Sequence, residues 1–337
     1  MKPLRLFTIL AAAAIAFGDM DPLGGQTAPY LRMGIGSRAE AMGNASVAML
    51  APTTVDAYWN PAMAVMMDGR FKTTAGVRFL TLGRRQGFAS VEGKIPPRLA
   101  VCAAILYHGD NDIPIYDNDG NNTYNGYFLS TATHIGFAYK LRRKLALGLN
   151  TTIHSNSVAA GPLESDRISS WELGNVDLSA FYQARADLAL GLNIKQVQGL
   201  LKWEVPTYGT ELNTVITHYV PMDIKAGAAF SRPIRGRAFR AAVDMDLFLI
   251  ASEETDLSFY QRFRQGEQSA EFHAGAEYFL YPEFPVRIGA STSDGFSCGM
   301  GFYFLQGSFA GHKLDYVFTL EPNGSGATHG VSWTTSW

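Results

Sequence analysis

The chain has 337 residues, a formal net charge of −2 and 47% hydrophobic residues, while charged residues make up only 17% of it. Its length fits two ordinary domains or one large all-β unit, and the near-zero charge gives no sign of a nucleic-acid partner. The charged fraction lies below the roughly one quarter that is usual for soluble domains.

The N-terminus has the pattern of a secretory signal peptide. Lys2 and Arg5 precede an apolar run, 6–17, which is too short to cross a bilayer as a helix, and small residues follow it. We therefore expect residues 1–20 to be removed, and no cysteine follows them to carry a lipid anchor. Since no later segment is long and apolar enough for a transmembrane helix, the exported protein is expected to be periplasmic, secreted or an outer-membrane barrel.

Residues 21–70, which we call the hatch, combine small residues with weak helical signals. Ser37 followed by Glu40 fits a capping box at a helix start, and residues 39–49 continue with helical spacing. Asn60-Pro61 indicates a turn that breaks a helix. A segment this short cannot form its own domain, so we expect it to plug the lumen of a barrel, with a periplasmic extension as the alternative.

From Phe71 onward, short segments alternate apolar and polar residues. The phrase LALGLN occurs twice, at 145–150 and 188–193, with leucines on one face and small or polar residues on the other. Such a face suits either the core of a β-sandwich or the lipid side of a membrane barrel. Fourteen strands are predicted, at about 71–80, 87–95, 98–107, 127–141, 144–154, 174–184, 187–197, 219–231, 238–251, 269–280, 284–292, 295–304, 308–320 and 328–337.

The connections between these segments favour the barrel. With one exception near Asp294, long connections alternate with tight turns, as in barrels with external loops and periplasmic turns. This parity places both termini in the periplasm. The charged residues of the strands share one face, which suits a polar lumen in which opposite charges pair, and the residues assigned to this face include Arg98, Asp246, Glu271 and His273. The chain ends on Trp337, as outer-membrane barrels often end on an aromatic residue.

These patterns predict an all-β membrane barrel of the bacterial outer membrane, in contact with its lipid. About 14 antiparallel strands cover residues 71–337, and the short, partly helical N-terminal hatch covers residues 21–70.

Motifs for catalysis or metal binding are weak. The histidines show no metal-binding spacing, and Cys102 and Cys298 are predicted on opposite faces of the wall, which argues against a disulfide. The sequence DNDG at 117–120 lacks the glycine and glutamate positions of a calcium loop and indicates a turn. Since no catalytic triad is recognisable either, we expect no enzymatic activity, no cofactor and no bound metal.

Several motifs resemble a known family. LRMGIGSRAEAMGNASVAM and VDAYWNPA are similar to the N-terminal signature of the PorV/PorQ family, outer-membrane proteins related to the FadL fatty-acid channels. GNNTYNGYF with GFAYKLRRKLALGLN resembles the early barrel of that family, and HKLDYVFTL with ATHGVSW resembles its last hairpin. The resemblance implies a fourteen-stranded barrel with an N-terminal hatch. The hatch residues that we single out on this basis are Gly34, Gly36, Ser37, Arg38, Trp59, Asn60, Pro61 and Ala62.

Two functions are compatible with these features. The resemblance to PorV/PorQ implies a structural or interaction component of type IX secretion, which holds or shuttles exported cargo at the cell surface. Its protein partners would bind external loops, notably 155–173, 198–218 and 252–268. The alternative is a FadL-like passive conduit for hydrophobic small molecules, with an apolar ligand pocket at the hatch around Trp59, Met63 and Met66.

Overall fold

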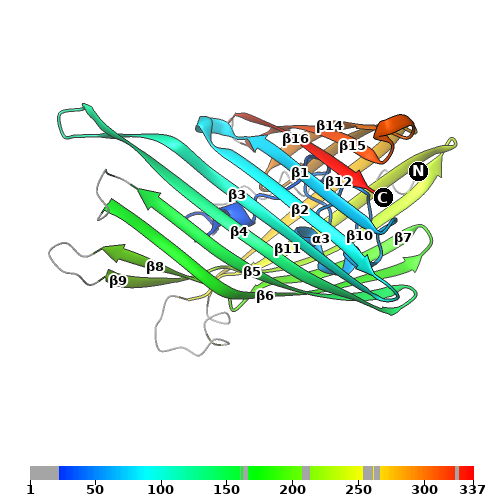
Figure 1. Ribbon diagram of the computed structural model, residues 1–337, viewed down its shortest axis with the longest axis horizontal. Helices are drawn as coiled ribbons and strands as arrows, with labels where there is room; N and C mark the ends of the chain where they lie inside the picture. Colours follow the sequence, from blue (N-terminus) through cyan, green and yellow to red (C-terminus); the bar gives the residue numbers. More distant parts are fainter. Residues whose placement is uncertain are drawn as a thin grey trace.

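The computed structural model describes residues 23–159, 161, 166–206, 213–252, 261, 266–322 and 326–337. The described residues form one antiparallel sheet of sixteen strands, and fourteen of them close into a barrel because β5 pairs with both β4 and β6 (Figure 1). The remaining pair, β8 and β9, forms a hairpin at the edge of β6. The predicted fourteen-stranded barrel with an N-terminal plug is confirmed, while the predicted signal peptide lies outside the described residues.

The strands follow the chain around the wall, except where the β8–β9 hairpin interrupts the order. Their bounds are β1 Phe71–Phe79, β2 Arg85–Ile95, β3 Leu99–Tyr116, β4 Asn122–Arg142, β5 Leu145–Ala159, β6 Arg167–Arg185, β7 Leu188–Val197, β8 Leu200–Pro206, β9 Asn213–Tyr219, β10 Met222–Ile234, β11 Arg237–Leu249, β12 Gln268–Tyr281, β13 Phe284–Ser291, β14 Gly295–Tyr303, β15 His312–Leu320 and β16 Ala327–Ser336.

The alternation in the sequence corresponds to the two faces of the wall. In the first LALGLN copy, Leu147 and Leu149 are 43% and 49% exposed on the outside, whereas Ala146 and Asn150 are buried inside. The second copy, in β7, repeats this arrangement around Leu190. Because the outer face of the barrel contacts lipid, leucine there avoids the cost of placing a polar group in hydrocarbon.

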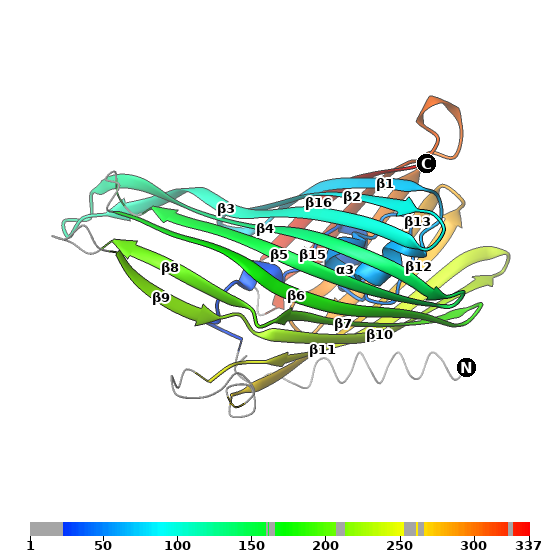
Figure 2. The same ribbon diagram turned by 60° about the horizontal axis from the view of Figure 1, so that its bottom comes forward.

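Four strands extend beyond the lengths that the sequence predicts. The external halves of β3 to β6 continue past the predicted ends, and the β8–β9 hairpin lies in a predicted loop, 198–218 (Figure 2). Polar residues interrupt the lipid-facing alternation in these halves, as in the stretch 108–126. At the tip of β3 and β4, the Asp117 carboxylate accepts backbone N–H bonds from Asp119 and Asn121, both 2.9 Å long, and those from Asn121 lower the pKa of Asp117. The turn predicted there is confirmed.

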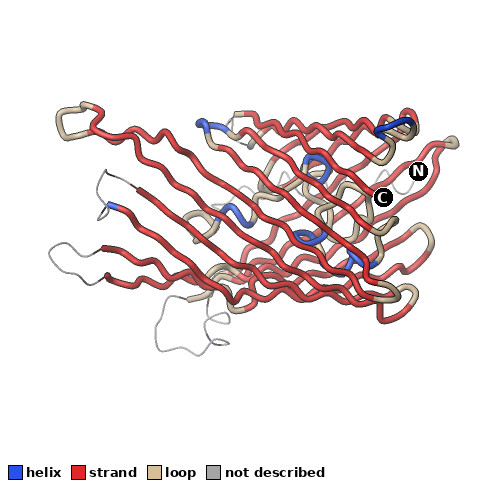
Figure 3. Tube along the Cα trace, viewed as in Figure 1, coloured by secondary structure: helices blue, strands red, loops and turns tan. Residues whose placement is uncertain are grey.

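The hatch lies inside the ring of strands as four short helical segments joined by irregular chain (Figure 3). These are η1 Pro29–Leu31, α2 Ser37–Ala41, α3 Asp56–Trp59 and η2 Pro61–Val65. Beyond the hatch, short 3₁₀ segments occur at η3 Thr81–Gly83 and η5 Gly307–Phe309.

The predicted capping box at the start of α2 does not form. Gly36 occupies the N-cap and no side chain caps the helix, while the Glu40 carboxylate lies 3.4 Å from the Arg78 guanidinium of β1. The helical pattern predicted over 39–49 also ends after one turn, and the later backbone N–H groups of Ser46 and Val47 donate to Asp244 of the wall. The helical spacing therefore reflected contacts with the barrel rather than a longer helix.

The hatch starts near the external rim. Leu23 packs against Phe248 and Ile250 at the external end of β11, and the chain leaves the lumen at the periplasmic start of β1. The N-terminus itself lies outside the described residues, so its periplasmic position stays a prediction, while the described part of the hatch begins near the external rim. The alternation of long loops and tight turns determines which end of each strand is external. It does not determine the path of the hatch, which crosses the lumen once.

Candidate functional site

The hatch bridges two opposite sides of the lumen. The segment η2 contacts strands β2 to β6, whereas α2 contacts β13 to β16. We call the first contact, made by residues 58–65, the neutral seat. The second, made by residues 37–49 with strands β10 to β15, we call the charged seat.

The neutral seat is built mainly from backbone contacts and uncharged hydrogen bonds. The hatch makes a buried ion pair just before it, where Lys72 of β1 lies 3.1 Å from Asp56 and 2.7 Å from Glu92 of β2. The Asn60 side-chain amide donates to the carbonyl oxygens of Val47, at 2.8 Å, and Ala180 of β6, at 3.1 Å. The Ala62 backbone N–H donates to the Ser179 hydroxyl at 3.1 Å. Asn60 thereby ties the start of η2 both to the wall and to the rest of the hatch.

The repeated sequence LALGLN contributes residues to both seats. The inward glycine of the first copy, Gly148, lies under η2, where an added Cβ would come 2.5 Å from the Ala62 nitrogen. In the second copy a Cβ on Gly191 would overlap the Val47 carbonyl group. Asn193 of that copy donates to the Trp59 carbonyl oxygen at 3.0 Å. LALGLN therefore presents leucine to lipid and leaves room on its inner face for the hatch backbone.

Inward glycines recur around the wall wherever the hatch comes close. At each of them an added Cβ would come within 3.5 Å of a hatch atom, so the hatch packs directly against the strands there. These glycines are Gly136, Gly148, Gly191, Gly227, Gly275, Gly289, Gly299 and Gly330.

Most of the apolar contact of the hatch is on the neutral side. Trp59 and Met63 are 2% and 0% exposed in a cluster that includes Leu106 and Phe181 of the wall. The apolar cluster at the charged seat is much smaller and includes only Ala229 and Ala242 from the described wall. Trp59 and Met63, with the partly buried Met66 against them, therefore belong to a packed core, and the apolar pocket predicted around these three side chains is filled.

The charged seat is centred on a buried network of ion pairs. The Arg38 guanidinium of α2 donates twice to the Glu277 carboxylate of β12, at 3.0 Å each. The same carboxylate pairs with Arg287 at 2.7 Å and Arg240 at 2.8 Å, and Arg287 also lies 2.7 Å from Asp315. The sequence-based prediction that opposite charges pair in the lumen is confirmed for these residues. Such pairing offsets the cost of burying ions.

Two further carboxylates hold the hatch on this side. Asp244 of β11 accepts the backbone N–H groups of Ser46 and Val47, at 2.6 Å and 2.9 Å. Asp294, in the turn between β13 and β14, accepts a 2.8 Å hydrogen bond from the Asn44 side chain. Arg98, which the face pattern assigned to the lumen, is instead exposed at the periplasmic turn before β3, because the strand alternation ends before it.

A small cavity of about 10 Å³ borders the neutral seat. It is lined by Tyr58, His134, Lys195 and Asp223 among others, and the Lys195 ammonium lies 3.9 Å from the centre of the Tyr58 ring. This volume is about that of one water-sized probe, so an organic ligand fits here only after the hatch moves.

The eight hatch residues singled out from the sequence divide between the seats. Trp59 and Asn60-Pro61-Ala62 lie at the neutral seat, and Ser37 and Arg38 lie on the opposite side. Gly34 and Gly36 adopt φ angles of 75° and 94°, which favour glycine, at the turns that lead into α2. All eight lie in the lumen, while a role in ligand binding stays a prediction.

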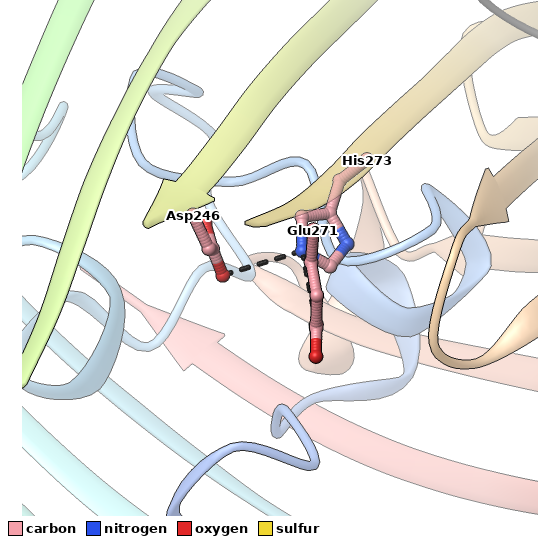
Figure 4. A group of neighbouring side chains, drawn as sticks. All are labelled: Asp246, Glu271 and His273. Carbon is pink, nitrogen blue, oxygen red and sulfur yellow. Dashed lines mark ion pairs between the residues drawn. The ribbon is translucent and has the colours of Figure 1, made fainter. Parts of the chain in front are cut away.

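Three side chains that belong to no common sequence motif lie close together at the charged seat. Asp246 of β11 and Glu271 and His273 of β12 have donor atoms within 4.8 Å of one another (Figure 4). Face analysis assigned each of them to the lumen, but their proximity depends on the register of two strands separated by a long connection.

Fold and hatch together define a plugged β-barrel of the bacterial outer membrane. None of the described helices is long and apolar enough to cross a bilayer. No protein-family model matches the sequence, and no curated protein matches it.

Solved structures with a similar fold include hydrocarbon transporters. The toluene transporter TbuX of Ralstonia pickettii has a TM-score of 0.60 and 15% identity over 90% of this chain and 98% of its own. The toluene transporter TodX of Pseudomonas putida has a TM-score of 0.59 and 12% identity, with the same coverage. A FadL homologue of Pseudomonas aeruginosa has a TM-score of 0.54 and 10% identity over 88% of this chain and 96% of its own. The chain therefore has the fold of the FadL-like barrels.

Proposed function

We propose that the protein is a passive conduit for hydrophobic small molecules across the outer membrane, without catalytic activity. The observation that carries this proposal is the likeness of nearly the whole chain to the two toluene transporters. This likeness supports the conduit more than a role in secretion.

The two seats suggest how such a conduit opens. Ion pairs at the charged seat are rehydrated when the hatch moves, so breaking them costs little net free energy. Apolar contacts at the neutral seat are lost outright on separation. We therefore infer that the hatch stays anchored near Asn60 and moves at residues 37–49, which lets an apolar solute pass while ions are excluded.

Uptake measurements test the proposal. Gram-negative cells that produce the protein should take up radiolabelled toluene or oleate faster than cells that produce a barrel of unrelated fold. In a planar bilayer the intact protein should conduct almost no ions, because the hatch fills the lumen. Deletion of residues 28–67 should either open a large conductance or prevent assembly. Unchanged uptake of both tracers, or porin-like conductance of the intact protein, would contradict the proposal.

A second candidate function is supported by the external extension. Trp171 and Leu173 of β6 are 64% and 56% exposed, and Val215 of β9 is 57% exposed, beyond the closed part of the barrel. We propose as the alternative an interaction component resembling PorV/PorQ proteins of type IX secretion, whose partners bind this apolar surface. Affinity purification from native membranes should then recover an exported protein with the intact chain and lose it with Trp171→Ser. Recovery of apolar small molecules alone would favour the conduit.

A further inference from the structure

We propose that Asp246, Glu271 and His273 bind a divalent transition-metal ion that fastens the charged seat. Asp246 and Glu271 are directly paired across β11 and β12, and His273 follows two residues after Glu271 on the same inner face (Figure 4). Their donor atoms all lie within 4.8 Å of one another. The inference concerns the hatch itself and does not depend on which molecule crosses the barrel.

The histidine ring is oriented for this role by the hatch. His273 Nδ1 lies 2.9 Å from the Gly43 carbonyl oxygen, and since a carbonyl oxygen only accepts, Nδ1 carries the proton. With Nδ1 turned to Gly43, the Nε2 atom points toward the two carboxylates. Histidines that bind metals commonly donate their other N–H to a carbonyl or carboxylate group in this way.

Two buried atoms of this group have no hydrogen-bond partner, although Lys225 pairs with Asp246 Oδ2. Nε2 lies 3.2 Å from Asp246 Oδ2 and 3.8 Å from Glu271 Oε2, yet it makes no hydrogen bond of proper geometry, although His273 is only 4% exposed. The Asp246 Oδ1 atom is also buried without a hydrogen-bond partner. Unpaired acceptors in a buried site are costly, and a bound cation would satisfy all of them.

The charges around the three residues favour an additional cation. Lys225 pairs with Asp246. Among the described residues that interact electrostatically in this cluster, however, there are five carboxylates and only two lysines. The carboxylates belong to Asp223, Asp244, Asp246, Glu271 and Asp294, and the ammonium groups to Lys195 and Lys225.

The atoms available as metal ligands favour one class of metal ion. One imidazole nitrogen with two carboxylate oxygens suits zinc and related transition metals better than calcium or magnesium. Metal–ligand bonds of about 2.0–2.2 Å place neighbouring ligand atoms about 3.4 Å apart. The separations of 3.2 Å and 3.8 Å between Nε2 and the two carboxylates are close to this value. Glu271 is partly exposed, which leaves a path for the ion from the external side.

A bound ion would hold the hatch closed through His273. It would fix the ring whose Nδ1 proton binds Gly43, in the part of the hatch that rests on β12 and β13. Metal loading should therefore stabilise the charged seat and leave the neutral seat unchanged.

Zinc binding by the full-length protein in detergent micelles tests the site. After removal of metals with a chelator, equilibrium dialysis against zinc at pH 7 should give one tightly bound ion per chain. Affinity for this ion should fall at least tenfold in Glu271→Gln and His273→Gln, and zinc should raise the thermal unfolding temperature of the intact protein but not of these two variants. Glu271→Gln changes a partly exposed side chain, so it keeps the test informative if the histidine variant does not fold.

Two matched variants serve as controls. Asp294→Asn removes one negative charge from the same region, and His312→Gln removes an imidazole at the periplasmic end. Both should retain the zinc ion. Equal zinc binding by the intact protein and by Glu271→Gln and His273→Gln, or no retained zinc in the intact protein, would overturn the inference.

Discussion

The two seats of the hatch hold the same segment by different forces. The neutral seat buries a large apolar cluster and uses uncharged hydrogen bonds, with Asn60 at its centre. The charged seat has few apolar contacts and depends on Glu277, Asp244 and the carboxylates near them. Local opening is easiest where few apolar contacts are buried, so the difference assigns anchoring to one side and movement to the other.

The largest expected effect is at the centre of the charged seat. Glu277→Ala would leave Arg38, Arg240 and Arg287 without their shared partner, which should destabilise the barrel by about 3–5 kcal/mol. Urea unfolding, followed by the gel shift of the folded barrel, measures this loss. Glu283→Ala, in the turn that follows the same strand, is the matched control and should have little effect. Equal stabilities of the two variants would show that the network does not hold the hatch.

A substitution on the lipid-facing surface tests the stability of the barrel wall independently of the hatch contacts at the two seats. Leu147→Arg should cost about 2–4 kcal/mol if the residue lies near the bilayer midplane, because the charge would face hydrocarbon. Folding into lipid vesicles measures the cost, and the hatch should stay seated in the fraction that folds. Tolerance of arginine at Leu147 would contradict the assignment of this face to lipid.

A methyl group added beneath the hatch should have a somewhat smaller effect. In Gly191→Ala the new Cβ would overlap the Val47 carbonyl group, and overpacking of this kind costs about 1–3 kcal/mol. The control is Gly87→Ala, where the nearest atom to the new Cβ is 3.8 Å away. Thermal unfolding of both variants should show a loss of stability only for Gly191→Ala.

The smallest effect is expected for one hydrogen bond of the neutral seat. Ser179→Ala removes the hydroxyl that accepts from the Ala62 backbone N–H, while Asn60 still accepts from the same N–H at 3.1 Å. The loss should be about 0.5–1.5 kcal/mol. A loss as large as that of Glu277→Ala would indicate that the neutral seat, rather than the charged one, dominates the polar energetics.

The wall could be predicted from the sequence because its two faces alternate strictly. Both LALGLN copies have their leucines outside, and all fourteen strands of the barrel were found near their observed positions. The β8–β9 hairpin and the external half of β3 were missed, since strands in water outside the closed barrel need no lipid-facing residues.

The hatch could be predicted only in part. Its placement follows from small residues and the Asn60-Pro61 turn, but its contacts depend on strand register. Nothing in the sequence pairs Arg38 with Glu277, 239 positions later, or places Gly191 under Val47. The same limit hid the cluster of Asp246, Glu271 and His273, because residues from separate strands form no local motif.

Hydrogen–deuterium exchange of the hatch in the assembled barrel tests most directly that one seat anchors and the other opens. Backbone amides of residues 37–49 should exchange faster than those of residues 60–65, since the charged seat opens locally while η2 stays on its apolar cluster. Faster exchange at 60–65, or equal rates in both segments, would contradict the account.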